Sequence, residues 1–113
     1  MAVPDNIRIE EPWIAFADDE EDQASAAKIA ERLKKDLPKG HALSGLELKA
    51  VAKRVDQDDV LFEVLGGDQP LAVVHVTWQR EADPRWPSTK FFRSWDEWVD
   101  KAMKPDHVEY HFR

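Results

Sequence analysis

The sequence predicts an α+β fold in which a three-stranded antiparallel meander packs against two helices in the order α-β-β-β-α. Three observations support it: helical periodicity over residues 23–37, two-residue alternation in three consecutive segments, and a second apolar helical stripe after residue 94. We therefore expect one domain over residues 23–113, preceded by an acidic N-terminal extension over residues 1–22.

The first helix is predicted over residues 23–37. Apolar side chains recur there at helical spacing, while lysine, arginine and glutamate occupy the other face. Asp22 or a neighbouring acid can cap the first turn, and Pro38 and Gly40 end the helix. The apolar stripe consists of Ala26, Ile29, Ala30, Leu33 and Leu37.

Three strands are predicted next, over residues 46–53, 60–65 and 71–78. Their even-numbered residues are apolar, which places them together on one face of a sheet. The segments between the strands are rich in turn-forming residues and favour hairpins. The sequence therefore predicts a meander of three neighbouring strands.

The parity of these strands also predicts their register. If Ala52 pairs with Phe62, and Phe62 with Val74, all the even positions form one core face, to which Trp78 belongs. The odd positions mix charged and apolar side chains. We expect that opposite face to meet solvent, as one face of an antiparallel sheet commonly does, although its apolar positions leave room for partial covering.

The last helix begins with a capping box formed by Ser94 and Glu97. Lys104 and Pro105 end it, and Asp106 can cap one further turn. An apolar stripe is expected to pack the helix onto the sheet. This stripe consists of Trp95, Trp98, Val99, Ala102 and Met103.

The α-β-β-β-α order, across roughly residues 23–112, resembles that of the double-stranded-RNA-binding domain. That family has a basic cluster at the start of its second helix, whereas this chain has Asp96 and Glu97 there. Phosphate contacts supply much of the affinity for nucleic acids. We therefore expect no nucleic-acid partner.

The formal net charge of −7 is concentrated at one end of the chain. Residues 1–22 hold eight acidic residues and a single basic one, Arg8, whereas the other 91 residues are balanced. A concentrated acidic surface attracts basic partners and speeds association at low salt. The absence of cysteine excludes disulfides and thiolate metal sites.

No apolar run is long enough to span a membrane, and the first residues lack the pattern of a secretory signal. We expect a cytoplasmic protein without a membrane partner.

The leading functional hypothesis is a small interaction protein, of an inhibitor or immunity type, that masks the basic surface of another protein. Trp86 lies in a polar loop between Pro84 and Pro87, where a stiffened, exposed tryptophan would suit an interface. The alternative is that Trp86 folds back and caps the core. We expect a monomer or a weak homodimer. The predicted partner-binding residues are Asp18, Asp19, Glu20, Glu21, Asp22, Arg85 and Trp86.

An alternative is a small enzyme or ligand-binding domain that uses the outer sheet face around His75. In the predicted register Glu63 lies diagonal to His75 and could orient it as a general base. No motif places a nucleophile beside this pair, so catalysis is the less expected reading. A simple surface histidine is the ordinary interpretation.

His107 and His111 are four residues apart, as two metal ligands on a helix can be. Val108 stands where a zinc protease motif needs glutamate, and spacing selects no third ligand. Histidines near a helix C-terminus also interact favourably with its dipole. We therefore predict no metal site and no cofactor.

Overall fold

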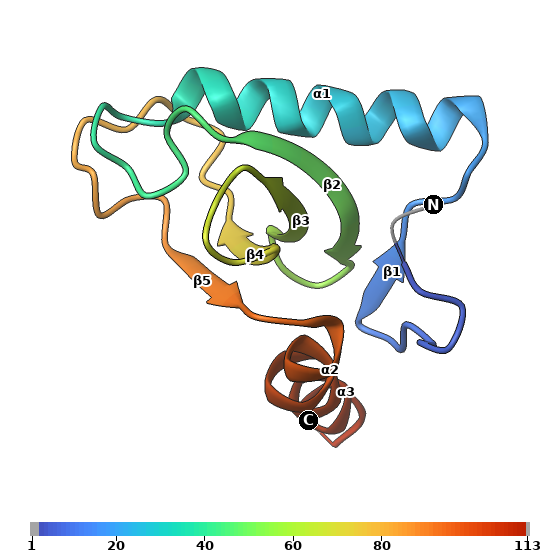
Figure 1. Ribbon diagram of the computed structural model, residues 1–113. Helices are drawn as coiled ribbons and strands as arrows, with labels where there is room; N and C mark the ends of the chain where they lie inside the picture. The colour runs from blue at the N-terminus through green and yellow to red at the C-terminus, as the bar shows by residue number, and fades with distance from the viewer. Residues whose placement is uncertain (1–2, 113) are drawn as a thin grey trace.

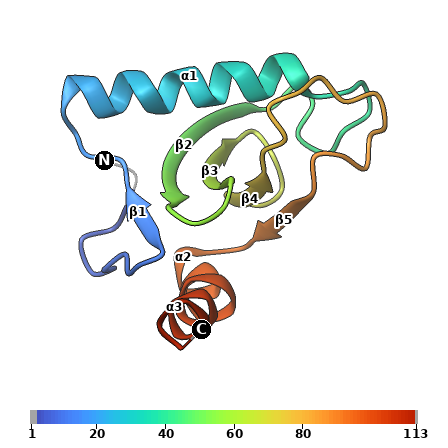
Figure 2. The ribbon, with the colours of Figure 1, turned by 180° about the vertical axis from the view of Figure 1, so that it is seen from behind.

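The computed structural model describes residues 3–112, which form an antiparallel sheet with helices on both faces (Figure 1, Figure 2). The five strands lie in sequence order, so that each pairs with the next one along the chain. They are β1 (Trp13–Ala15), β2 (Glu47–Arg54), β3 (Asp59–Leu65), β4 (Leu71–His75) and β5 (Thr89–Phe92). The helices are α1 (Glu20–Asp36) and a C-terminal helical segment made of α2 (Trp95–Trp98), the π-helical turn η1 (Val99–Met103) and α3 (Lys104–His111).

The α+β class and the antiparallel sheet agree with the sequence prediction, but the strand number and the α-β-β-β-α order are wrong. Two edge strands, β1 and β5, extend the predicted meander to five strands. These strands have 3 and 4 residues, too few to give a recognisable alternation. The likeness in element order to the double-stranded-RNA-binding domain is therefore limited to α1, the three central strands and the last helical segment.

Helix α1 begins inside the acidic run, three residues before the predicted start. The carboxylate of Asp19 accepts a hydrogen bond from the amide of Asp22 at 2.8 Å and caps the helix. Ala26, Ala30 and Leu33 are buried against the sheet. Among residues 3–112, neither α1 nor any other helix has the length and apolar character needed to cross a membrane.

The segment expected as an acidic extension, residues 1–22, contributes β1 and the first turn of α1. Trp13 in β1 is only 2% exposed. Residues 1 and 2 of the expected extension, and residue 113 of the domain expected over residues 23–113, lie outside the described part of the chain. The segment is thus continuous with the sheet over the residues that the structure describes.

A β-bulge in β2 changes which side chains face each side of the sheet. Ala50 pairs with Phe62, but Ala52 pairs with Leu61, which leaves Val51 as the extra residue. The predicted pairing of Ala52 with Phe62 is therefore wrong. Even-numbered side chains before the bulge face α1, whereas Ala52 faces the opposite side.

Each face of the sheet has its own apolar core. One core lies between the sheet and α1, and the second lies between the opposite face and the C-terminal helical segment (Figure 1). The face expected to meet solvent is therefore largely covered. In the second core Trp13 meets Trp98 edge to face, with ring centroids 5.3 Å apart. Its buried members are Trp13, Val51, Ala52, Leu61, Leu71, Phe92, Trp98 and Met103.

Candidate functional site

A pocket of about 400 Å³ lies between α1, the turn that joins β2 to β3, and Trp78. Its walls combine aliphatic and aromatic side chains with acidic and basic ones, and six of the ten lining residues are polar or charged. Convergent polar groups beside apolar surface are typical of binding sites. The lining consists of Ile29, Val55, Val60, Trp78, Lys53, Arg54, Asp56, Gln57, Asp58 and Asp59.

Trp78 has an unusual backbone conformation at this pocket. Its φ of 56° lies in the left-handed region, which costs a bulky residue roughly 1–3 kcal/mol. Its carbonyl oxygen accepts a hydrogen bond from Arg32 on α1, and Arg32 also pairs with Asp36 at 2.7 Å. The side chain is 42% exposed, so the prediction of a core position is wrong. Strand β4 ends at His75, and residue 78 lies beyond the sheet.

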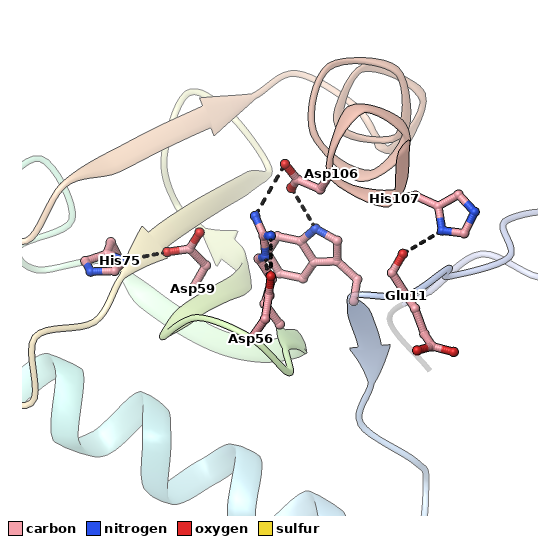
Figure 3. Close-up of polar contacts among 8 residues, drawn as sticks. Glu11, Asp56, Asp59, His75, Asp106 and His107 are labelled. Carbon is pink, nitrogen blue, oxygen red and sulfur yellow. Dashed lines mark hydrogen bonds and ion pairs between the residues drawn. The ribbon is translucent and has the colours of Figure 1, made fainter. Parts of the chain in front are cut away.

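The three carboxylates of the pocket differ in how they are paired. Asp56 accepts two hydrogen bonds from Arg54, each of 2.9 Å, and Asp59 lies 2.7 Å from the ring of His75 (Figure 3). Asp58 is exposed, and its carboxylate has no hydrogen-bond or ion-pair partner within residues 3–112. Asp58 is therefore available to an incoming cation.

Arg54 lines the pocket and links three parts of the chain. Its side chain is 5% exposed, and it contacts Asp106 of α3 at 3.3 Å as well as Asp56 (Figure 3). Asp106 also accepts a hydrogen bond of 3.0 Å from the indole of Trp13. Burial lowers the pKa of Arg54, but the Asp56 hydrogen bond and the nearby carboxylate charges outweigh burial and raise it overall. The positive charge of Arg54 is thus compensated inside the protein.

His75 is paired with Asp59, which the sequence did not predict. Strand β3 aligns Asp59 with His75 and Glu63 with Leu71, so Glu63 is not the partner of the histidine. The Nδ1 atom lies 2.7 Å from the Asp59 carboxylate, while Nε2 has no partner in the described part of the chain. The side chain is 56% exposed. A carboxylate therefore orients an accessible imidazole on the sheet.

The acidic run, residues 18–22, is divided between two roles. Asp19 caps α1, and Asp22 accepts a hydrogen bond of 2.7 Å from the amide of Ala17. The side chains of Asp18, Glu20 and Glu21 are exposed and make no hydrogen bond or ion pair with residues 3–112. These three acids are the part of the run that is available for a partner.

Trp86 and Arg85, the other predicted partner-binding residues, lie away from the acidic run. Their loop joins β4 to β5 and passes the C-terminal end of α1, whereas the acidic run is at its N-terminal end (Figure 1). The helix has 17 residues, so its ends are about 25 Å apart. Trp86 is 49% exposed. Arg85 is paired with Asp83 at 2.7 Å, and this hydrogen-bonded contact raises the pKa of Arg85.

The two C-terminal histidines lie side by side on α3, with ring centroids 4.4 Å apart. The Nδ1 atom of His107 is 2.6 Å from the carbonyl oxygen of Glu11, and its Nε2 atom is 3.3 Å from the carboxylate of Glu10. His107 therefore fastens the N-terminal segment to α3 (Figure 3). Among residues 3–112, no three histidine or acidic side chains are grouped so that they could hold a metal ion.

The pocket itself was not predicted from the sequence. Its acidic residues lie in a turn that the sequence does identify, at residues 56–59, and three of these four residues are aspartates. No local sequence signal places Trp78 at the same pocket, because its position depends on where β4 ends and on the hydrogen bond from Arg32 of α1.

A scan against protein-family models finds no match, and searches of curated proteins and of solved structures find no significant similarity.

Proposed function

We propose that this protein is a small acidic interaction module that binds a basic partner protein and masks its basic surface, as an inhibitor or immunity-type protein would. The observation that carries the proposal is a pocket lined both by the half-exposed Trp78 and by Asp58, whose carboxylate has no partner within residues 3–112. Partly exposed tryptophan held on a fixed backbone is a common anchor of protein interfaces.

The distribution of charge supports the same function. The chain carries a net charge of −7, and Asp18, Glu20 and Glu21 add exposed carboxylates at the start of α1. Ile29 of the pocket follows Glu20 by nine residues, or about 14 Å along the helix axis. A standard interface of roughly 800 Å² per partner spans such a distance. Long-range attraction to a basic surface would weaken as salt rises.

This function is tested by affinity capture at low salt from a lysate of the native host, with three forms of the protein as bait. The wild type is compared with Asp18→Asn/Glu21→Gln/Asp58→Asn, which retains Asp19, the cap of α1, and Asp22, which accepts the hydrogen bond from the amide of Ala17. The matched control removes the same charge elsewhere, in Glu47→Gln/Asp68→Asn/Glu109→Gln.

We expect a basic protein that the wild type and the control retain and that the first variant loses. With that protein purified, the first variant should bind at least about tenfold more weakly, because hydrogen bonds to charged groups contribute about 1.5–3 kcal/mol each. If no basic protein is retained, or if both variants lose it equally, the proposed function is wrong.

A second candidate function is acid–base chemistry at His75. It is favoured by the 2.7 Å contact between Asp59 and Nδ1, which leaves Nε2 available to take a proton from a substrate. Asp59 would hold the ring in one tautomer and orientation, as the carboxylates of catalytic histidines do. In this role Asp59 replaces Glu63, the orienting residue expected from the sequence.

Hydrolysis of a panel of activated ester and phosphoester substrates tests this alternative. His75→Gln should lower any turnover by about 100-fold or more, since general base catalysis contributes about 10²–10⁴. Asp59→Asn should lower it less, and Glu63→Gln should leave it unchanged. Turnover that persists in His75→Gln would exclude this candidate.

A further inference from the structure

We infer that the pocket receives an arginine side chain of the basic partner, with its guanidinium stacked on the indole of Trp78 and paired with the carboxylate of Asp58. The inference rests on the proposed function, and it names the chemical group that this site recognises.

The cations of the described residues at the pocket, Lys53 and Arg54, make no ion pair with Asp58. Arg54 is buried and compensated by two carboxylates. The ammonium group of Lys53 lies 5.7 Å from the ring centroid of Phe16, over that ring. The pocket therefore offers Asp58 a position for an additional positive charge.

The walls suit the whole length of an arginine side chain. Val55 is 50% exposed and Trp78 is 42% exposed, so both have apolar surface that an aliphatic chain could cover. A planar guanidinium can stack on the indole and donate two parallel hydrogen bonds to a carboxylate at the same time. An ammonium group has neither the plane nor the fork, so lysine fits this pair of contacts less well.

Both recognition groups are carried by a fixed backbone. The carbonyl oxygen of Asp58 accepts a hydrogen bond of 2.9 Å from the amide of Val76, which ties the turn to the segment after β4. The carbonyl oxygen of Trp78 is held by Arg32 on α1. Two contacts fixed before binding reduce the entropic cost of association.

The test is an NMR titration of the ¹⁵N-labelled protein with N-acetyl-arginine amide. The indole resonance of Trp78 is identified by its loss in Trp78→Phe. N-acetyl-citrulline amide has nearly the same shape without the charge, and N-acetyl-lysine amide has the charge without the plane. Asp58→Asn removes the carboxylate, and Asp68→Asn makes the same change in the turn between β3 and β4.

We expect the arginine probe to shift the Trp78 indole and the amides of residues 55–59 in a saturable way. Asp58→Asn should weaken this binding about tenfold, the range of one charged hydrogen bond, while Asp68→Asn binds as the wild type does. The lysine and citrulline probes should bind more weakly than arginine. Equal binding of arginine and citrulline, equal binding of arginine and lysine, or unchanged binding by Asp58→Asn would overturn the inference.

The two proposals fail in different ways. If the arginine probe does not bind but a basic partner is captured in a charge-dependent manner, the pocket assignment is wrong and the interaction function stands. If the probe binds as expected but no such partner is captured, the pocket has the inferred chemistry and the masking function is wrong.

Discussion

Trp78 combines a costly backbone conformation with a large, half-exposed side chain at the pocket. Trp78→Gly and Trp78→Ala both remove the indole and its contacts, but glycine adopts a φ of 56° without strain and alanine does not. We therefore expect Trp78→Gly to be the more stable variant by about 1 kcal/mol, against the usual advantage of alanine. Urea unfolding followed by circular dichroism measures this difference.

Trp86 provides the matched control for that comparison. Trp86 is also a half-exposed tryptophan in the loop between β4 and β5. Unlike Trp78, it does not have a positive φ. At position 86 glycine should not be more stable than alanine. If glycine and alanine are equally stable at position 78, the backbone there is not strained.

The contact between His75 and Asp59 illustrates what the sequence reveals about single residues. Alternation places His75 away from α1, and this is confirmed by its exposure. Which carboxylate lies beside His75 depends on the register between β3 and β4. A shift of two residues keeps the same face but exchanges Glu63 for Asp59 as the neighbour of His75. Phe62 pairs with Ala72, not with Val74 as expected, so Asp59 lies opposite His75. The geometry of the β3–β4 turn sets this register, and turn composition alone does not specify it.

The capping box at the start of α2 gives a pH-dependent prediction. Ser94 accepts a hydrogen bond from the amide of Glu97, and the carboxylate of Glu97 accepts one of 3.0 Å from the amide of Arg93. This second bond lowers the pKa of Glu97. Because the folded state prefers the ionised carboxylate, its contribution is present above the unfolded pKa of about 4.3 and is lost as pH falls through the lower folded pKa.

The wild type should therefore be more stable than Glu97→Gln at pH 7, with a difference that shrinks on acidification below about pH 4. Urea unfolding at a series of pH values measures it. Glu109→Gln removes an exposed carboxylate of α3 that has no partner within the described residues, and it should show no such trend. A difference that stays constant from pH 7 to pH 3 would contradict the assigned role of Glu97.

Elements with strong periodicity were predicted well, and those that depend on tertiary contacts were not. Helix α1, the three central strands and the helix start at Ser94 all have local signals that match the structure. The bulge at Val51 has no such signal, yet it redirects the end of β2 towards the second core. Strands β1 and β5 exist because they pair with longer neighbours, which short segments cannot reveal by themselves.

At the scale of the whole molecule, the N-terminal segment and the C-terminal helices hold each other in place. Trp13 reaches Asp106 through its indole nitrogen, and His107 reaches the carbonyl oxygen of Glu11. The pocket depends on this arrangement, because Asp106 also neutralises the buried Arg54. The sequence does not reveal this contact, because the two segments lie more than 90 residues apart in the chain.

Residues 1–15 should therefore be required for stability and not only for charge. Trp13→Ala would leave a cavity beside Trp98 in the second core and is expected to cost about 3–5 kcal/mol, whereas Ile14→Ala, at a side chain that is 48% exposed, should cost less than about 1 kcal/mol. Urea unfolding of both variants measures the contrast. Similar small losses would show that the segment is an appended tail. A large loss of unfolding free energy in Trp13→Ala alone would mean that a protein lacking residues 1–15 is too unstable for a binding experiment. The acidic surface then has to be altered by substitution in the full chain.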